Sequence, residues 1–253
     1  MAPAPAPALE LVVFDCDGVL VDSEAIACLC FAEALAAIGI ERSPAELDAA
    51  FRGRRLDECL VEVEGWLGRP LPRSFEGRLR AATGERLRRD LLPVAGIHAA
   101  IDAIRTRFDV PVCVASSSEP DRIALSLATT GLDHHFRGRI FSATQVPRGK
   151  PAPDLFLHAA RCLGADPAAC AVIEDSPAGM RAGVAAGMRV FAYLADGHDL
   201  STELASTCTP FRRMDALPAL LAAFRRAQGP AASTEGGAGG TLGPDTPASG
   251  ALS

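Results

Sequence analysis

The sequence predicts an α/β protein: a doubly wound parallel sheet with an inserted α-helical domain. Two observations predict the sheet. Short, nearly continuous apolar segments recur along the 253 residues, and amphipathic helical segments separate most of them, as in β-α-β units. A third observation predicts the insert: about 70 residues after the first apolar segment show no strand-like pattern.

Five apolar segments are expected to form the strands. Their almost unbroken apolar character is typical of strands buried on both faces. Ser176-Pro177 and Gly187 have the pattern that begins and ends the last of the intervening helices. The expected strands are residues 9–15, 110–116, 140–143, 170–174 and 189–194, and the expected helices are residues 97–108, 121–130, 153–163 and 177–186.

The stretch after the first strand is expected to be a helical bundle. Ser23 is predicted to cap a helix that runs to Ile38 and stops at Gly39. Residues 43–46 match a capping box with proline at the first helical position. Residues 56–67 and 74–91 have helical patterns as well, and the single tryptophan, Trp66, is expected to pack inside the bundle.

These patterns divide the chain into a core, an insert and two tails. Residues 1–8 alternate alanine and proline and are expected to be a flexible lead. Residues 228–253 contain no lysine, arginine or aromatic residue and are expected to be a disordered tail. The sheet core is expected to comprise residues 9–18 and 95–227, and the helical insert residues 19–94.

Charge and composition exclude several classes of function. The net charge of −6 argues against a nucleic-acid partner, and no apolar run approaches the roughly 20 residues that span a bilayer. The N-terminus lacks the features of a secretory signal, so a cytoplasmic protein is expected, either a monomer or a weak dimer. The eight cysteines form no C-x-x-C pair and are expected to be buried thiols, and the five histidines, expected at the surface or at helix ends, show no metal-binding spacing.

Polar residues follow four of the expected strands, at the carboxyl ends where ligands bind in doubly wound sheets. Clustered carboxylates repel one another unless a cation lies among them, and an oxygen-only site suits Mg²⁺. A serine hydroxyl, a serine amide and a lysine would supply donors for an anion beside it, an arrangement suited to phosphoryl transfer. The segments are Asp15-Cys16-Asp17-Gly18, Ser116-Ser117-Ser118, Gly149-Lys150-Pro151 and Glu174-Asp175-Ser176. Ser118 is also expected to cap the next helix, and capping is the alternative role for Ser116.

These segments resemble the motifs of the haloacid dehalogenase superfamily phosphohydrolases. Residues 14–24 are similar to the first motif, 114–116 to the second, 149–154 to the third and 172–176 to the fourth. The resemblance extends over residues 9–226, and the helical insert matches the subclass with a C1-type α-helical cap between motifs one and two. It implies a Rossmann-like core and a Mg²⁺-dependent phosphatase.

The resemblance also implies a role for each acidic residue. Asp15 would attack phosphorus and form an aspartyl phosphate, while Asp17 would act as acid and then as base. Mg²⁺ would bind the Asp15 carboxylate, the Asp17 carbonyl oxygen and the Asp175 carboxylate, with Glu174 a direct, water-mediated or merely supporting group. The second aspartate argues against haloalkanoate dehalogenation, since the dehalogenases of the superfamily lack it.

The remaining motif residues and the cap loop concern the substrate. By the same resemblance, Ser116, Ser117 and Lys150 would bind the phosphoryl oxygens. In the cap loop, Arg52, Gly53 and Arg54 would set specificity for a small phosphorylated metabolite with a second anionic or hydroxyl-rich part, such as 6-phosphogluconate or a hexose phosphate. The alternative for these arginines is a solvated loop that pairs with neighbouring acids.

Two other functions are considered from the sequence. A β-phosphoglucomutase-type mutase shares the four motifs and the cap. Those mutases have a histidine where this chain has Ala27 and a cap-loop arginine where it has Leu56, which favours hydrolysis. A catalytically silent binding protein is disfavoured because the set of motif residues is intact.

Overall fold

The computed structural model describes residues 9–195 and 199–228. The predicted flexible lead, and the predicted tail from residue 229 onward, lie outside the described residues. Gln228, placed in the tail by the sequence analysis, is instead the last residue of a helix. Among the described residues, no helix combines the length and apolarity needed to cross a membrane.

Six parallel strands form one sheet in the order β3-β2-β1-β4-β5-β6. The strand β1 lies between β2 and β4, and the pairs Val13–Cys113 and Val13–Val172 align their carboxyl ends at one edge. A sixth strand was not predicted, because it has three residues with Pro210 in the middle, a composition tolerated only at a sheet edge. The strands are β1 (Leu11–Phe14), β2 (Val112–Ser116), β3 (Ile140–Ser142), β4 (Cys170–Glu174), β5 (Arg189–Tyr193) and β6 (Thr209–Phe211).

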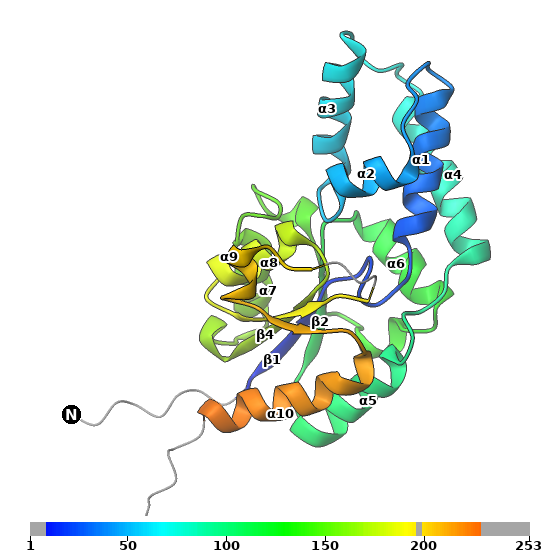
Figure 1. The fold of residues 1–253 in the computed structure, drawn as a ribbon. Helices are drawn as coiled ribbons and strands as arrows, with labels where there is room; N and C mark the ends of the chain where they lie inside the picture. The colour runs from blue at the N-terminus through cyan, green and yellow to red at the C-terminus, as the bar shows by residue number, and fades with distance from the viewer. Residues whose placement is uncertain (1–8, 196–198, 229–253) are drawn as a thin grey trace, which may run out of the picture.

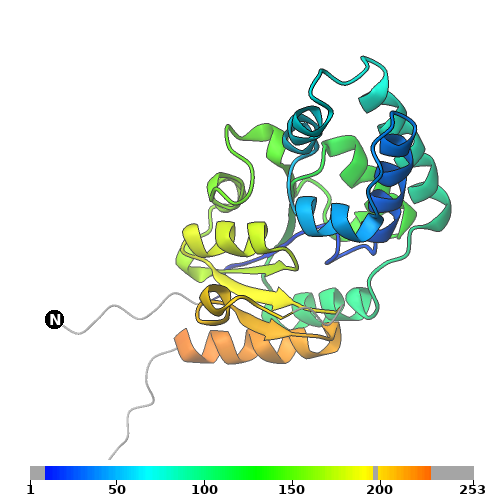
Figure 2. The same ribbon diagram turned by 45° about the horizontal axis from the view of Figure 1, so that its top comes forward.

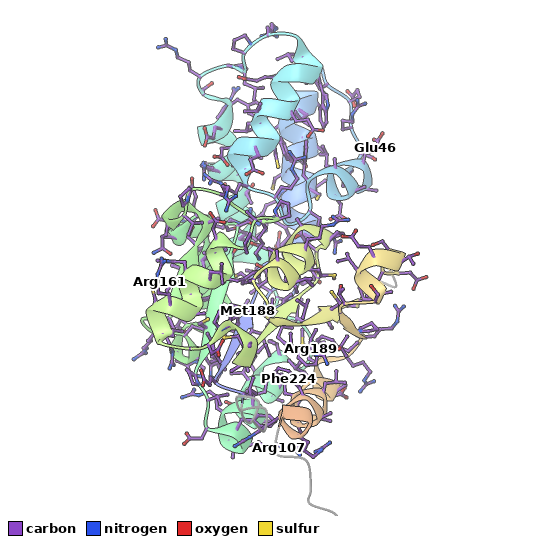
Figure 3. The ribbon with its side chains drawn as sticks, turned by 90° about the vertical axis from the view of Figure 1, so that its left-hand side faces the viewer. Glu46, Arg107, Arg161, Met188, Arg189 and Phe224 are labelled. Atoms are coloured by element: carbon purple, nitrogen blue, oxygen red, sulfur yellow. The ribbon has the colours of Figure 1, made fainter. Side chains whose placement is uncertain are left out.

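Helices cover both faces of this sheet, as predicted for a doubly wound fold (Figures 1 and 2). Alternate residues of β1 enter two separate apolar clusters: Val12 and Phe14 pack toward α5, α6 and α10, while Leu11 and Val13 pack toward α7 and α8. Arg189 lies over the Phe224 ring of α10 at the end of the molecule opposite the insert (Figure 3). These helices are α5 (Ile97–Phe108), α6 (Pro120–Thr129), α7 (Asp154–Leu163), α8 (Pro177–Ala185), α9 (Thr202–Ala205) and α10 (Leu217–Gln228), with short 3-10 helices at Asp133–His135, Ala143–Gln145, Pro167–Ala169 and Met214–Ala216.

Four further helices stand beyond the carboxyl edge of the sheet and have an apolar cluster of their own (Figure 1). The predicted capping box forms, since the Glu46 amide donates to Ser43 Oγ and the Glu46 carboxylate accepts from the Ser43 amide. Both connections to the core pass Val21, which bridges Asp17 on one side and Pro93 on the other. The helices are α1 (Glu24–Ala36), α2 (Pro44–Phe51), α3 (Leu56–Leu67) and α4 (Phe75–Asp90).

Several local predictions were wrong. Trp66 is not inside the bundle: it is 36% exposed because it lies near the outer end of α3. Its ring stacks on Phe51, and the Arg42 guanidinium lies over it. Cys162 is exposed, whereas the other seven cysteines are buried as predicted. His135 is buried and its ring contacts the Arg105 guanidinium, but it is the last residue of the 3-10 helix Asp133–His135 and so lies at a helix end, as expected.

Two serines predicted as helix caps have other partners. Ser23 precedes α1 but its backbone is helical and its hydroxyl makes no cap. Ser118 does not cap α6, whose N-cap residue is Glu119. Both hydroxyls donate instead to the Asp17 carboxylate, because a buried carboxylate without donors costs more than an uncapped helix end.

Candidate active site

The chain turns sharply after β1 and places two aspartates at the carboxyl edge of the sheet. Asp15 follows the last strand residue and is buried. Gly18 makes the turn with φ +80°, and a Cβ there would come 2.2 Å from Asp175 Oδ2. Only glycine therefore allows the first-motif loop to approach the end of β4 this closely.

Lys150 joins the ends of β1 and β4. Its Nζ donates to Asp15 Oδ1 and to Glu174 Oε1, both at 2.6 Å, and the side chain is 1% exposed. Burial lowers the pKa of Lys150, but the two carboxylates outweigh burial and raise it above its ordinary value. Lys150 is the only lysine in the chain, a signal that the sequence analysis missed.

Three carboxylates converge beside this lysine. Asp15, Glu174 and Asp175 each offer an oxygen within 4.8 Å of the others. Burial, helped by the neighbouring acids, raises the pKa of Asp15 to about 8 despite Lys150, and raises that of Asp175 well above its ordinary value. Lys150, together with the Arg52 guanidinium that contacts Asp175, supplies two positive charges against three buried carboxylates. The cluster therefore favours either protons or a cation, and its oxygen-only donor set fits Mg²⁺.

Glu174 differs from the other two acids in its hydrogen bonds. Its Oε1 accepts from Lys150, and its Oε2 accepts from the amide and the hydroxyl of Ser176 at 2.8 and 2.9 Å. Both oxygens therefore already have protein donors. In turn the Ser176 hydroxyl accepts from the Gly179 amide and caps α8, as predicted.

Asp17 is held by three donors from three parts of the chain. Ser23 and Arg122 donate to Oδ1, the arginine at 2.9 Å, and Ser118 donates to Oδ2 at 2.7 Å. Burial raises the pKa of Asp17, but the Arg122 guanidinium and the two hydroxyls outweigh burial and lower it below its ordinary value. Asp17 is thus ionised at neutral pH in this arrangement.

The two serines expected to bind phosphate both line the cavity above the sheet. Ser116 is buried at the end of β2, where its hydroxyl accepts from the Ser118 amide. Ser117 donates its hydroxyl to the Gly53 carbonyl oxygen at 2.8 Å. The residue that follows the second motif therefore contacts the cap loop directly.

The three arginines of the cap loop have different surroundings. Arg52 donates to Asp48 and, through Nη1, to Asp175 Oδ2 at 3.1 Å. Arg54 pairs with Glu62, and Arg55 pairs with Asp57 as the solvated-loop alternative expected. Of the three, only Arg52 contacts the acidic cluster at the sheet edge.

Gly53 brings the cap loop against the core. It has φ +76°, and a Cβ there would come 2.2 Å from Ser176 Oγ. Together with the Ser117–Gly53 hydrogen bond and the Arg52–Asp175 ion pair, this contact places the insert directly over the strand ends.

A cavity of about 510 Å³ lies between the insert and the sheet edge. Asp15, Asp17 and the second-motif serines face it, whereas Lys150, Glu174 and Asp175 lie outside its wall. Glu24, Arg80 and Arg122 also line it, and the sequence assigned none of them a role. Glu24 is the last residue of the first motif but resembles an ordinary first-turn acid of α1, and no motif contains Arg80 or Arg122. Ala27 and Leu56 line it too.

Comparisons with known proteins agree with this geometry. The family profile of the haloacid dehalogenase-like hydrolases matches residues 9–187. The chain is 32% identical over 213 residues to 6-phosphogluconate phosphatase of Escherichia coli (strain K12), covering 84% of this chain and 94% of that protein. It is 31% identical over 187 residues to hexitol phosphatase B of the same strain, covering 70% and 80%. A haloacid dehalogenase-like protein of unknown function from Agrobacterium tumefaciens str. C58 has a similar structure, with TM-score 0.70, 34% identity and coverage of 85% and 99%.

Proposed function

The chain belongs to the haloacid dehalogenase-like hydrolases and is a phosphatase of that family, and from this premise we propose that it hydrolyses a sugar or sugar-acid phosphate with Mg²⁺. The observation that supports this most is the convergence of Asp15, Asp17 and the lysine-bound acids under one cavity. A buried lysine bridging two carboxylates is costly to maintain for stability alone.

Asp15 is the proposed nucleophile. Lys150 occupies its Oδ1, which leaves Oδ2 to attack phosphorus while the bond from phosphorus to the sugar oxygen breaks. Asp17, which is ionised without substrate, takes up a proton from solvent when the negatively charged substrate phosphate binds beside it, and gives that proton to the sugar oxygen. It then takes a proton from the water that attacks the aspartyl phosphate. The second step releases inorganic phosphate and restores the Asp15 carboxylate.

The Asp15 carboxylate, the Asp17 carbonyl oxygen and the Asp175 carboxylate are proposed to hold Mg²⁺. When bound, the ion would offset the repulsion between Asp15 and the substrate phosphate. Glu174 is proposed to support this group rather than to bind the metal, since both of its oxygens already accept protein hydrogen bonds. Ser116, Ser117 and Lys150 are proposed to contact the phosphoryl oxygens.

The relatives and the cavity support the substrate class. The chain covers most of the length of a 6-phosphogluconate phosphatase and of a hexitol phosphatase, and the cavity is large enough for a six-carbon leaving group. Ala27 and Leu56, which face the cavity, have neither a titratable group nor a phosphate-binding group. This absence at the two positions favours hydrolysis over phosphoryl transfer within a sugar.

The helical insert is proposed to act as a cap over the core. We assign residues 19–94 to the cap and residues 9–18 and 95–227 to the core, since Arg52 and Gly53 reach across to the sheet edge while both connections lie together at Val21. Arg52 and Gly53 are the proposed cap residues nearest the reacting phosphate. Arg54, paired with Glu62, is proposed to contribute at the cavity wall.

The test is Mg²⁺-dependent phosphate release from a panel of phosphomonoesters, with the Asp15→Asn variant as control. The panel includes 6-phosphogluconate and glucitol 6-phosphate. They differ only at carbon 1, which is a carboxylate in the first and a hydroxymethyl group in the second. Release that prefers one of them and is lost in the variant would support the proposal. Disappearance of β-glucose 1-phosphate without phosphate release would identify a mutase, and no turnover of any ester would indicate a silent binding protein.

A further inference from the structure

Arg122 is an ion-pair partner of Asp17 that no sequence motif indicates. It lies in the first turn of α6, and its Nη2 donates to Asp17 Oδ1 at 2.9 Å. Within residues 9–195 and 199–228, this is its one hydrogen bond, and its Nε is buried without an acceptor. Leaving this N–H unpaired costs about 1–3 kcal/mol, a cost that the remaining contacts of the side chain must offset. The ion pair with Asp17, rather than a surrounding hydrogen-bond network, therefore holds the side chain in place.

The three donors to Asp17 are not equivalent. Ser23 and Ser118 donate neutral hydroxyls, whereas Arg122 donates from a charged guanidinium and so adds a Coulombic attraction to its hydrogen bond. Arg122 also lies within the electrostatic reach of Glu24, a second carboxylate of the cavity wall. The guanidinium therefore lies in the field of two acids, and its direct contact is with Asp17.

We propose that Arg122 is a positioning residue that fixes the Asp17 carboxylate for proton transfer to the leaving oxygen and from the attacking water. The inference rests on the proposed function, in which Asp17 performs both transfers. In the first step the proton moves from Asp17 to the sugar oxygen as its bond to phosphorus breaks. In the second step a water proton moves to Asp17 as the water oxygen bonds to phosphorus. Arg122 neither gives nor takes a proton.

Leaving groups that differ in their need for a proton test this role. An alkoxide must be protonated as it departs, whereas p-nitrophenolate leaves without a proton. The Arg122→Gln variant should lower kcat for glucitol 6-phosphate by about 10–100-fold, with little change in KM. With p-nitrophenyl phosphate, the first step should stay within a few-fold of wild type, while the second step, which still needs Asp17, slows. Rapid mixing should then show a burst of about one equivalent of p-nitrophenolate per enzyme.

Two variants serve as comparisons. Arg122→Lys keeps a charged donor and should restore part of the lost rate. Arg181→Gln removes an exposed ion pair between Arg181 of α8 and Glu203 of α9. Neither residue lines the cavity, so this variant should behave as wild type with both substrates. If Arg122→Gln fails to fold, as judged by circular dichroism, the burst is sought in Arg122→Lys.

The inference is overturned if the folded Arg122 variant loses the same factor with both substrates and shows no burst, or if only KM changes. Wild-type enzyme that releases no phosphate from any ester would contradict the proposed function instead. The two failures are therefore distinguishable.

Discussion

Replacing Gly53 by alanine should reduce activity far more than it reduces stability. The new Cβ would lie 2.2 Å from Ser176 Oγ and 2.5 Å from Ser176 Cβ, whereas ordinary contact begins at 3.4 Å. Ser176 cannot move away easily, because it is buried, caps α8 and donates to Glu174. The cap loop must therefore retreat by roughly 1 Å, and a misplacement of that size in a catalytic site costs about 100-fold in rate.

The matched control is Gly68→Ala. Gly68 has φ +69°, close to the +76° of Gly53, but a Cβ there meets nothing within 4 Å. Both variants should lose about 1–2 kcal/mol of unfolding free energy from the backbone strain, measured by urea denaturation. Only Gly53→Ala should lose kcat/KM, measured by phosphate release from the preferred ester. Equal activity in the two variants would refute the reasoning that this contact sets cap closure.

Three further predictions concern the acidic cluster and the helices beside it. Asp15→Asn should lower turnover by at least about 1,000-fold and leave a cooperative thermal transition, which would exclude unfolding as the cause of the loss. Mg²⁺ should raise Tm more at about pH 9 than at about pH 6, because protons held by Asp15, with its pKa raised to about 8, and by Asp175 must leave before the metal binds. Without metal the same raised pKa values favour the folded state at low pH, and this stabilisation is lost as the pH rises through about 8. A Mg²⁺-induced Tm shift that does not change with pH would contradict the first statement, and a metal-free Tm that does not fall as the pH rises through about 8 would contradict the second. Gly179→Ala should destabilise the protein by about 3 kcal/mol or more, because its Cβ would overlap Glu174 Oε1, whereas Gly77→Ala in an open position of α4 should stabilise it by up to about 1 kcal/mol; urea unfolding of the pair would show the opposite signs.

Periodicity predicted most of the elements because it depends on near neighbours in the chain. The helices 97–108 and 56–67 have the predicted bounds, since each has an amphipathic face and clear end signals. The strand Thr209–Phe211 was missed because three residues around a proline contain too little pattern. Trp66 was misplaced because periodicity shows that a residue faces a neighbour but not how far the neighbouring helices extend.

The candidate site was predictable to the extent that it lies at strand ends. Parallel strands bring their carboxyl ends to one edge, so acids that follow β1 and β4 must meet there, and the structure places Asp15 and Asp175 within one cluster. The lysine of the third motif joins Asp15 to Glu174, the residue before Asp175, through contacts that span 135 and 24 residues. The motif spacing indicated its presence, but its role as a bridge between Asp15 and Glu174 depended on the folded loop.

Contacts between distant elements were decided by the tertiary structure alone. The Arg52–Asp175 pair spans 123 residues and the Arg122–Asp17 pair spans 105, and no local pattern distinguishes these arginines from solvated ones. Ser23 shows why: its sequence context is that of a helix cap, yet its hydroxyl bonds Asp17 because the fold buries that carboxylate beside it. Patterns of near neighbours therefore predicted the sheet, the helices of the insert and which acidic residues gather at the strand ends. The partners of each buried charge followed from desolvation, which acts only once the chain has folded.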